Sequence, residues 1–109
     1  MTLTDKTGAP VTVTRADAEF DIAVEGKPVG LMTFVERDVH RVFLHTEVEP
    51  AFNGRGLATL LIGEGLAATR ADGMRIVAVC PMVAAYVKKH HEYDDIVDPP
   101  TPSILDSLP

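Results

Sequence analysis

The sequence of 109 residues has only one cysteine and no tryptophan, and aromatic residues make up 6% of it. A single cysteine cannot form a disulfide within the chain, so we expect the protein to work in a reducing compartment, the cytoplasm. Serine is also scarce and occurs only at Ser103 and Ser107. Their place near the C-terminal end argues against serine-hydrolase chemistry.

Basic residues are outnumbered by acidic ones, and the formal net charge is −6. This balance argues against nucleic-acid binding, which needs basic side chains that neutralise phosphates. An acidic surface weakly favours cationic partners such as amines or basic peptides. No apolar run approaches the about 20 residues that span a membrane, and the first residues lack a signal-peptide pattern. We therefore expect no nucleic-acid or membrane partner, and a monomer or weak homodimer.

The hydrophobic pattern predicts one α+β domain, an α/β sandwich, at residues 1–97 and a proline-rich tail at 98–109. Residues 1–10 are polar and predict a loose start. Short alternating runs predict a meander of antiparallel strands, and a run that is apolar on both faces predicts a buried parallel strand. The antiparallel strands are expected at residues 11–14, 20–25, 29–35 and 40–48, and the parallel strand at 75–80.

Two main helices are expected, at about residues 56–72 and 82–90, from apolar residues at helical spacing. Gly63 and Gly65 interrupt the first helix at a cost of roughly 1 kcal/mol each relative to alanine, which indicates close backbone packing. The face of this helix that should cover the sheet consists of Leu57, Leu60, Leu61, Ala68 and Ala71.

The tail contains four prolines within residues 98–109. Proline removes a backbone donor and fixes φ, so we expect this density to prevent regular secondary structure. The prediction is a mobile tail or an extended arm, with Ile104, Leu105 and Leu108 available to dock on a partner.

One stretch dominates the expectations about function. A strand ends near Val48, Pro50 follows, and a loop with Gly54 and Gly56 leads directly into a helix. The glycines let backbone N–H groups approach a ligand, and the helix start adds unpaired donors and partial positive charge, so phosphate oxygens are the natural ligand. The loop lacks the Gly-Lys-Ser/Thr ending of nucleotide triphosphatases and the third glycine of dinucleotide-binding loops.

Val48-x-Pro50, followed by Asn53, Gly56 and Ala58, resembles the acyl-CoA loop of the GNAT superfamily of N-acetyltransferases. In that pattern an arginine or glutamine usually stands where this chain has Asn53. The resemblance implies a GNAT-like mixed, mainly antiparallel sheet whose strands splay at the acyl-CoA site. It also implies acetyl-CoA as co-substrate. The expected cofactor-binding residues are Val48, Asn53, Gly54, Arg55, Gly56, Leu57, Ala58 and Thr59.

Cys80 closes the predicted parallel strand and directly precedes a helix that begins at Pro81. The positive end of that helix would stabilise a thiolate. In a GNAT-like sheet the pantetheine arm enters between the strands that end at Val48 and start at Arg75, which implies that Cys80 lies near the reactive sulfur. The alternative is that Cys80 is a small buried hydrophobic residue.

His45 and Glu47 stand two residues apart and therefore share one face of a strand. Beside a thioester this pair can take a proton from an ammonium or a thiol; the alternative is a solvated polar face. In the superfamily a tyrosine on the second helix often protonates the departing CoA thiolate, which is the role that the resemblance implies for Tyr86; the alternative is a packing tyrosine. Metal-ligand types occur without paired spacing, so no metal site is expected; they are His45, Glu47, Cys80, His90 and His91.

Three motifs that occur in order strengthen the resemblance: His-Thr-Glu-Val-x-Pro, Gly-Arg-Gly-Leu-Ala, and Val-Cys-Pro followed by Ala-Ala-Tyr-Val-Lys-Lys-His. Together they resemble a group of miniature GNAT-like proteins over roughly residues 18–97, although that group usually has His-Pro-Glu-Tyr at positions 90–93. The resemblance implies an N-acetyltransferase that moves an acetyl group from acetyl-CoA to an amine of a small molecule or peptide. Direct transfer and an acetylated Cys80 both remain open.

The miniature group lacks the helices that close the substrate site in longer members. An open site excludes water poorly. The alternative function is therefore a non-catalytic CoA-binding or sensor module that uses the same pocket.

Overall fold

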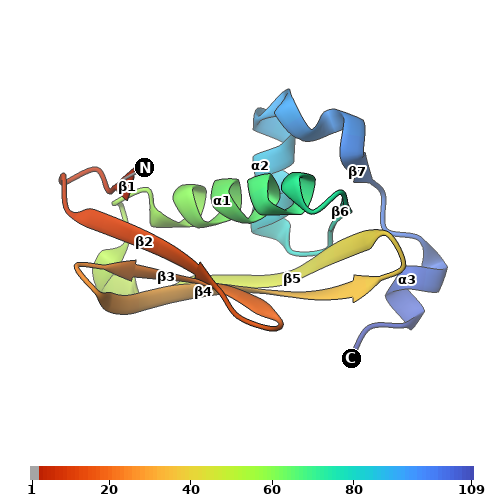
Figure 1. Ribbon diagram of the computed structural model, residues 1–109, viewed down its shortest axis with the longest axis horizontal. Coiled ribbons are helices and arrows are strands. Elements are labelled where there is room, and N and C mark those ends of the chain that lie inside the picture. Colours follow the sequence, from red (N-terminus) through yellow and green to blue (C-terminus); the bar gives the residue numbers. More distant parts are fainter. Residues whose placement is uncertain (1–2) are drawn as a thin grey trace.

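A computed structural model describes residues 3–109 of the chain (Figure 1). Across these residues a seven-stranded sheet runs in chain order from β1 to β7. The strands are β1 (Leu3–Thr4), β2 (Pro10–Arg15), β3 (Glu19–Val24), β4 (Lys27–Arg37), β5 (His40–Val48), β6 (Arg75–Ala78) and β7 (Val97–Asp98). The helices are α1 (Leu57–Ala71), α2 (Pro81–Lys89) and α3 (Pro102–Asp106), with 3₁₀ turns at Pro50–Phe52 and His91–Ile96.

The sheet is mixed and mainly antiparallel, as predicted. Strands β2 to β5 form the expected meander, whereas β6 pairs in parallel with both β5 and β7. A parallel neighbour needs a crossover connection, and α1 supplies it between β5 and β6. Helices α1 and α2 lie on one face of the sheet, and no helix of the described chain covers the other face of β2–β5 (Figure 1).

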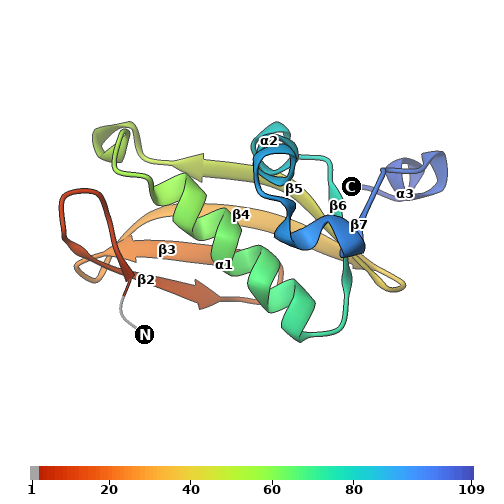
Figure 2. The same ribbon diagram turned by 90° about the horizontal axis from the view of Figure 1, so that it is seen from above.

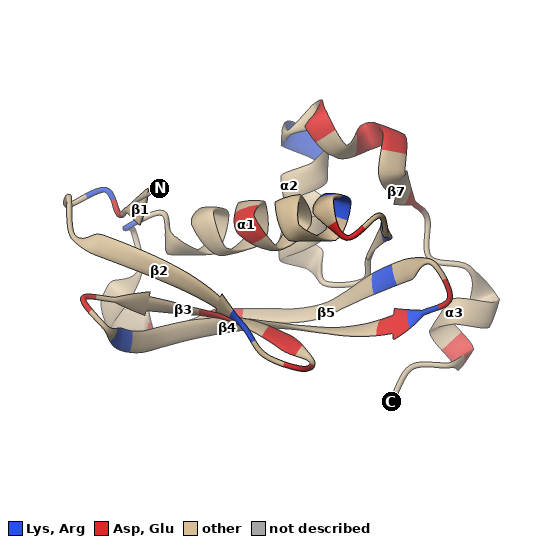
Figure 3. Ribbon diagram, viewed as in Figure 1, with Lys and Arg blue, Asp and Glu red and all other residues tan. Residues whose placement is uncertain are grey.

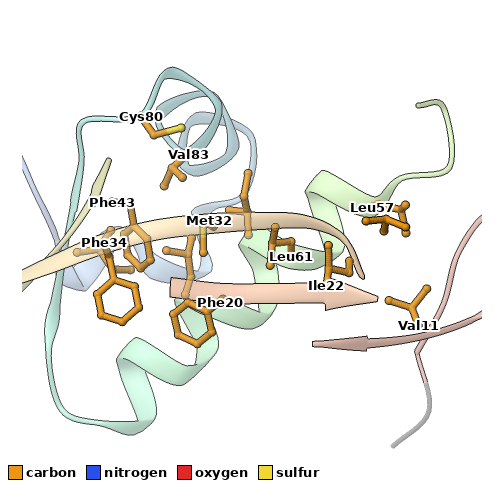
Figure 4. Close-up of a cluster of buried hydrophobic side chains, with 14 of the residues drawn as sticks. Val11, Phe20, Ile22, Met32, Phe34, Phe43, Leu57, Leu61, Cys80 and Val83 are labelled. Atoms are coloured by element: carbon orange, nitrogen blue, oxygen red, sulfur yellow. The ribbon is translucent and has the colours of Figure 1, made fainter. Parts of the chain in front are cut away.

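Helix α1 runs obliquely across the sheet (Figure 2), and the core lies between them. Figure 4 shows strand residues such as Phe20, Met32 and Phe43 meeting Leu61 of α1 and Val83 of α2. Burial of this apolar surface is the main stabilisation of the fold.

The face of α1 that covers the sheet agrees with the prediction at Leu57, Leu60, Leu61 and Ala68, which pack in or against the core, but not at Ala71. Its buried residues are Leu57, Leu61, Ile62, Gly65, Leu66 and Thr69, whereas Ala71 is exposed. The contact line follows the i, i+4 row through Gly65 and Thr69, which an apolar pattern does not reveal. Thr69 fits there because its hydroxyl donates to the carbonyl of Gly65 at 2.8 Å.

The prediction of close packing at the helix glycines is confirmed. A Cβ at Gly65 would collide with Met32 of β4, and one at Gly63 would lie 3.0 Å from the hydroxyl of Tyr86. Glycine therefore lets α1 approach both the sheet and α2.

The expectation of a loose start at residues 1–10 is wrong for the described part of that segment; Met1 and Thr2 lie outside the described residues. β1 pairs with β2, and the turn between them closes on the carboxylate of Asp5. A strand of two residues is too short to show an alternating pattern, so the sequence could not reveal it.

The expectation that the prolines of the tail prevent regular structure is also wrong. β7 pairs with β6, and α3 follows with Pro102 in its first turn and Thr101 as N-cap, whose hydroxyl accepts from the amide of Ile104 at 3.2 Å. Proline is compatible with the first turn of a helix because that N–H has no intrahelical acceptor. Arg37 of β4 donates to the hydroxyl and the carbonyl of Ser107, at 3.1 and 2.9 Å.

Candidate functional site

The candidate site begins where β5 and β6 separate. The pairing of the two strands begins at His40 and Arg75 and ends at Phe43 and Ala78. The amides of Val79 and Cys80 then both donate to the carbonyl of Phe43, at 3.1 and 2.8 Å. From there to Val48, β5 has no strand partner on its β6 side within residues 3–109. An extended ligand can therefore hydrogen-bond to this edge as an added strand would.

A β-bulge explains the separation. Thr33 pairs with His45 and Phe34 pairs with Phe43, so Leu44 of β5 is left without an opposite residue on β4. A bulge bends the strand that carries it and increases its twist. It therefore turns the end of β5 away from β6, which produces the predicted splay.

The loop that follows β5 presents unpaired amides. Gly54 and Gly56 have φ of +82° and +76°, a left-handed conformation that glycine adopts without strain. Within the described chain, no protein group accepts a hydrogen bond from the amides of residues 54–59. Successive N–H groups in such a turn, at the positive end of α1, form a site for an anion such as a diphosphate.

A groove of about 460 Å³, called the loop groove below, lies between this loop and the free edge of β5. It is lined by most of the predicted cofactor-binding residues, namely Val48, Asn53, Gly54, Gly56, Ala58 and Thr59. The sequence therefore identified residues that the fold brings together around one opening.

Arg55 and Leu57, also predicted to bind the cofactor, offer only their backbone amides. The guanidinium of Arg55 lies 4.8 Å from the centre of the Phe52 ring and 3.4 Å from the carboxylate of Asp5. Leu57 is 2% exposed and belongs to the core. Neither side chain lines the groove, although both residues stand in the loop sequence.

A second groove, of about 240 Å³, contains Tyr86 of α2. Thr59 and Met82 line both grooves, so the two lie side by side. The ring of Tyr86 stacks on His90 at a centroid distance of 4.1 Å. Burial, reinforced by the nearby Glu92 carboxylate, raises the pKa of Tyr86 above its ordinary value. The phenol therefore keeps its proton at neutral pH, as an unperturbed tyrosine does, and only a strong base such as a thiolate would take it.

Cys80 lies between the separating strands but faces inward. The residue is 2% exposed, and its thiol donates to the hydroxyl of Thr46 at 3.4 Å. Figure 4 shows it on the α2 side of the core, near Val83. Thr46 lines the loop groove, so Cys80 stands directly behind the wall of that groove.

His45 and Glu47 share the helix-free face of β5, as predicted, and their side chains are 62% and 61% exposed. His45 Nε2 lies 3.6 Å from Glu47 Oε2. Glu47 lines both the loop groove and a larger groove of about 580 Å³ on the helix-free face of the sheet. It therefore stands at the junction of the two openings.

The sequence interpretation did not identify three groove residues: Thr46, Phe52 and Met82. Thr46 alternates with His45 and Glu47 along β5, so it had to point to the opposite face. Met82 is 43% exposed at the start of α2, and no sequence signal marks it, because single exposed apolar side chains are common on protein surfaces.

The residues considered as metal ligands do not gather. Cys80 contacts Thr46, His90 stacks on Tyr86, and His91 Nδ1 lies 2.9 Å from Asp94. Residues 3–109 contain no group of three or more His, Cys, Asp and Glu side chains that could hold a metal ion. In the same range, no helix has both the length and the apolar character needed to cross a membrane.

A mixed sheet that opens between two parallel strands, beside an amide-lined loop at a helix start, defines an acyl-CoA-binding acetyltransferase fold. The sequence profile of the GCN5-related N-acetyl-transferase family matches residues 19–96. The chain belongs to this family, whose enzymes take their acetyl group from acetyl-CoA.

Solved structures share the fold at low sequence identity. A GCN5-like protein from Staphylococcus aureus has a TM-score of 0.64 and 19% identity, over 84% of this chain and 91% of that one. Ribosomal-protein-alanine N-acetyltransferase from Brucella melitensis biovar Abortus 2308 has a TM-score of 0.51 and 21% identity, over 73% of this chain and 62% of its own. An N-acetyltransferase from Staphylococcus aureus Mu50 has a TM-score of 0.51 and 21% identity, over 81% of this chain and 53% of its own. No curated protein sequence matches the chain.

Proposed function

We propose that this N-acetyltransferase moves the acetyl group of acetyl-CoA directly to a primary amine of a small molecule or basic peptide. The observation that carries the proposal is the run of unpaired amides at residues 54–59 beside the free edge of β5. Those donors bind the diphosphate, and the edge near Val48 pairs with the pantetheine arm. Acetyl-CoA supplies a thioester that an amine can attack once it has lost its proton.

Glu47 is the proposed base, because it stands between the loop groove and the groove on the helix-free face. That larger groove is also lined by Asp21 and Glu49, whose carboxylates favour a cationic acceptor. An ammonium bound there loses its proton to Glu47, assisted by His45 at 3.6 Å. The protonated phenol of Tyr86, which lines the neighbouring groove, then donates its proton to the departing thiolate.

Direct transfer is favoured over an acetylated cysteine. A covalent carrier needs an accessible thiol, whereas Cys80 is 2% exposed and bonded to Thr46. In direct transfer, the role of Cys80 is to support the wall of the loop groove through its contact with Thr46. We further propose that the protein is a monomer or weak homodimer and that it works in the cytoplasm. The free thiol of Cys80 stays reduced in that compartment.

The second candidate is a non-catalytic CoA-binding or sensor module. It is favoured by the uncovered face of β2–β5, where nothing in the described chain closes over Glu47 (Figure 1). Water reaches such a site freely, which weakens the electrostatic contribution to catalysis.

One experiment separates these functions. The full chain is titrated with CoA by calorimetry, and is then incubated with acetyl-CoA and a panel of primary amines while free thiol is followed. Binding together with amine-dependent thiol release supports the transferase. Binding without release above the uncatalysed rate supports the module, and no binding contradicts both.

A further inference from the structure

The turn between β1 and β2 lies beside the loop that precedes α1, although the two are about 50 positions apart in the sequence. Figure 3 shows the basic residues of both segments close together at one end of the molecule. The amide of Lys6 donates to the carbonyl of Arg55 at 3.0 Å. The profile match covers residues 19–96, so this turn lies outside the matched residues.

Gly56 and Lys6 are in direct contact. A Cβ at position 56 would lie 3.2 Å from Cε of Lys6 and 3.6 Å from its Cγ. The lysine stem therefore runs along the bare Cα of Gly56, whose amide is one of the unpaired donors. The Cε that carries the ammonium group is the nearest of these atoms, so the positive charge of Lys6 lies beside the unpaired amides of the loop.

Asp5 fixes the turn that carries Lys6. Its carboxylate accepts hydrogen bonds from the amide and hydroxyl of Thr7, at 2.8 and 2.6 Å, and from the amide of Ala9 at 3.0 Å. The bond from the Thr7 hydroxyl is the largest of several effects that lower the pKa of Asp5. The same carboxylate lies 3.4 Å from the guanidinium of Arg55 and so holds this cation outside the loop groove.

Lys6 is the cation that this arrangement leaves available. Arg55 faces Asp5, and Lys27 lies over the ring of Phe52, 5.5 Å from its centre. Within the described chain, no carboxylate lies within ion-pair distance of Lys6, and its side chain is exposed. An unpaired ammonium beside convergent amides strengthens a diphosphate site by charge-assisted hydrogen bonds.

We propose that Lys6 is a ligand of the acyl-CoA diphosphate, and that the N-terminal turn is part of the donor site. Lys6 then supplies a positive charge that Asn53, which stands where the family pattern has an arginine or glutamine, does not carry. This inference rests on the proposed function, because it requires that CoA binds at residues 54–59.

The test compares Lys6→Met with Lys27→Met, which removes the same charge from the same end of the molecule but not from Gly56. Dissociation constants of CoA and of dephospho-CoA are measured by calorimetry on the full chain. Lys6→Met should weaken both ligands about tenfold and make binding less sensitive to salt, whereas Lys27→Met should leave both affinities unchanged. Circular dichroism checks that each variant is folded, and Lys6→Arg should retain most of the affinity.

Each contrary result has its own meaning. A loss confined to CoA would assign Lys6 to the 3′-phosphate and overturn the diphosphate contact. Equal losses in both lysine variants would show a general field effect, and unchanged affinity in Lys6→Met would remove Lys6 from the site. Absence of CoA binding in the unmodified protein would instead contradict the proposed function itself.

Discussion

The thiol of Cys80 donates to the hydroxyl of Thr46 at 3.4 Å, and this contact joins the two strands where their backbones have already parted. Thr46 is 5% exposed and Cys80 is 2% exposed. The side chains therefore close the inner end of the gap, while the outer part stays open toward the loop groove. The contact gives Cys80 a positioning role that does not require a free nucleophile.

Substitution of Cys80 tests that role. Cys80→Ser keeps a donor for Thr46 and should retain acetyl transfer within a few fold. Cys80→Ala loses the donor and leaves a small cavity, which should lower the free energy of unfolding by about 1–2 kcal/mol. Thiol-release assays and urea denaturation measure the two effects. Near-complete loss of transfer in Cys80→Ser, with unchanged CoA affinity, would instead support an acetylated cysteine.

The left-handed glycines of the loop should matter for both stability and binding. Gly56→Ala introduces strain of about 1–2 kcal/mol at a φ of +76° and also pushes against Lys6, so CoA should bind about tenfold more weakly. Gly73→Ala is the matched control: its φ is +71° and no atom lies within 4 Å of the added methyl group. Both variants should lose similar stability in urea, but calorimetry should show weaker CoA binding only for Gly56→Ala.

The amide-lined loop before α1 was predictable from the sequence because its geometry depends on the backbone. Val48, Gly54 and Gly56 mark a strand end and two left-handed turns, and local chemistry fixes such features wherever the chain folds. The direction of Arg55 was not predictable, since it depends on Asp5 and Phe52. Lys6 was missed for the same reason: its place over Gly56 results from pairing between β1 and β2.

The tail shows how a local rule can be applied too broadly. Proline excludes the interior of a helix but suits its first turn, so Pro102 marks the start of α3. Strand β7 was hidden because it has two residues and is held by tertiary contacts. Arg75 and His40 both bind the side chain of Asp98, and the pattern along the chain does not show this.

The ion cluster at β7 predicts how stability depends on pH. Asp98 accepts from Arg75 at 2.6 and 2.9 Å and lies 2.8 Å from His40, and these contacts, Arg75 first, lower the pKa of Asp98 to about 2. The unfolded value is about 3.9, so the contribution to stability is complete above about pH 4 and disappears as the pH falls toward 2.

Asp98→Asn should therefore unfold at lower urea concentration than the unmodified protein at pH 7. The difference should shrink below about pH 4 and vanish near pH 2. Asp17→Asn, at an exposed carboxylate of a turn, is the control and should change little at any pH. A difference for Asp98→Asn that stays constant from pH 7 to pH 2 would contradict the assignment.

Glu47 provides the sharpest test of the proposed chemistry, because Glu49 offers an equivalent carboxylate two residues away. Both carboxylates line the groove on the helix-free face, but of the two only Glu47 also lines the loop groove. Glu47→Gln should lower kcat at least about 100-fold, as expected for loss of a general base, and should leave the dissociation constant of CoA unchanged.

Glu49→Gln removes the same charge without removing a group from the junction of the two grooves. It should weaken a cationic acceptor modestly through KM and should leave kcat near the unmodified value. Raising the pH should partly restore kcat of Glu47→Gln, because a larger fraction of the acceptor then arrives as the free amine. Equal effects of the two substitutions on kcat, or no rescue at high pH, would show that the carboxylates act only by attracting the acceptor.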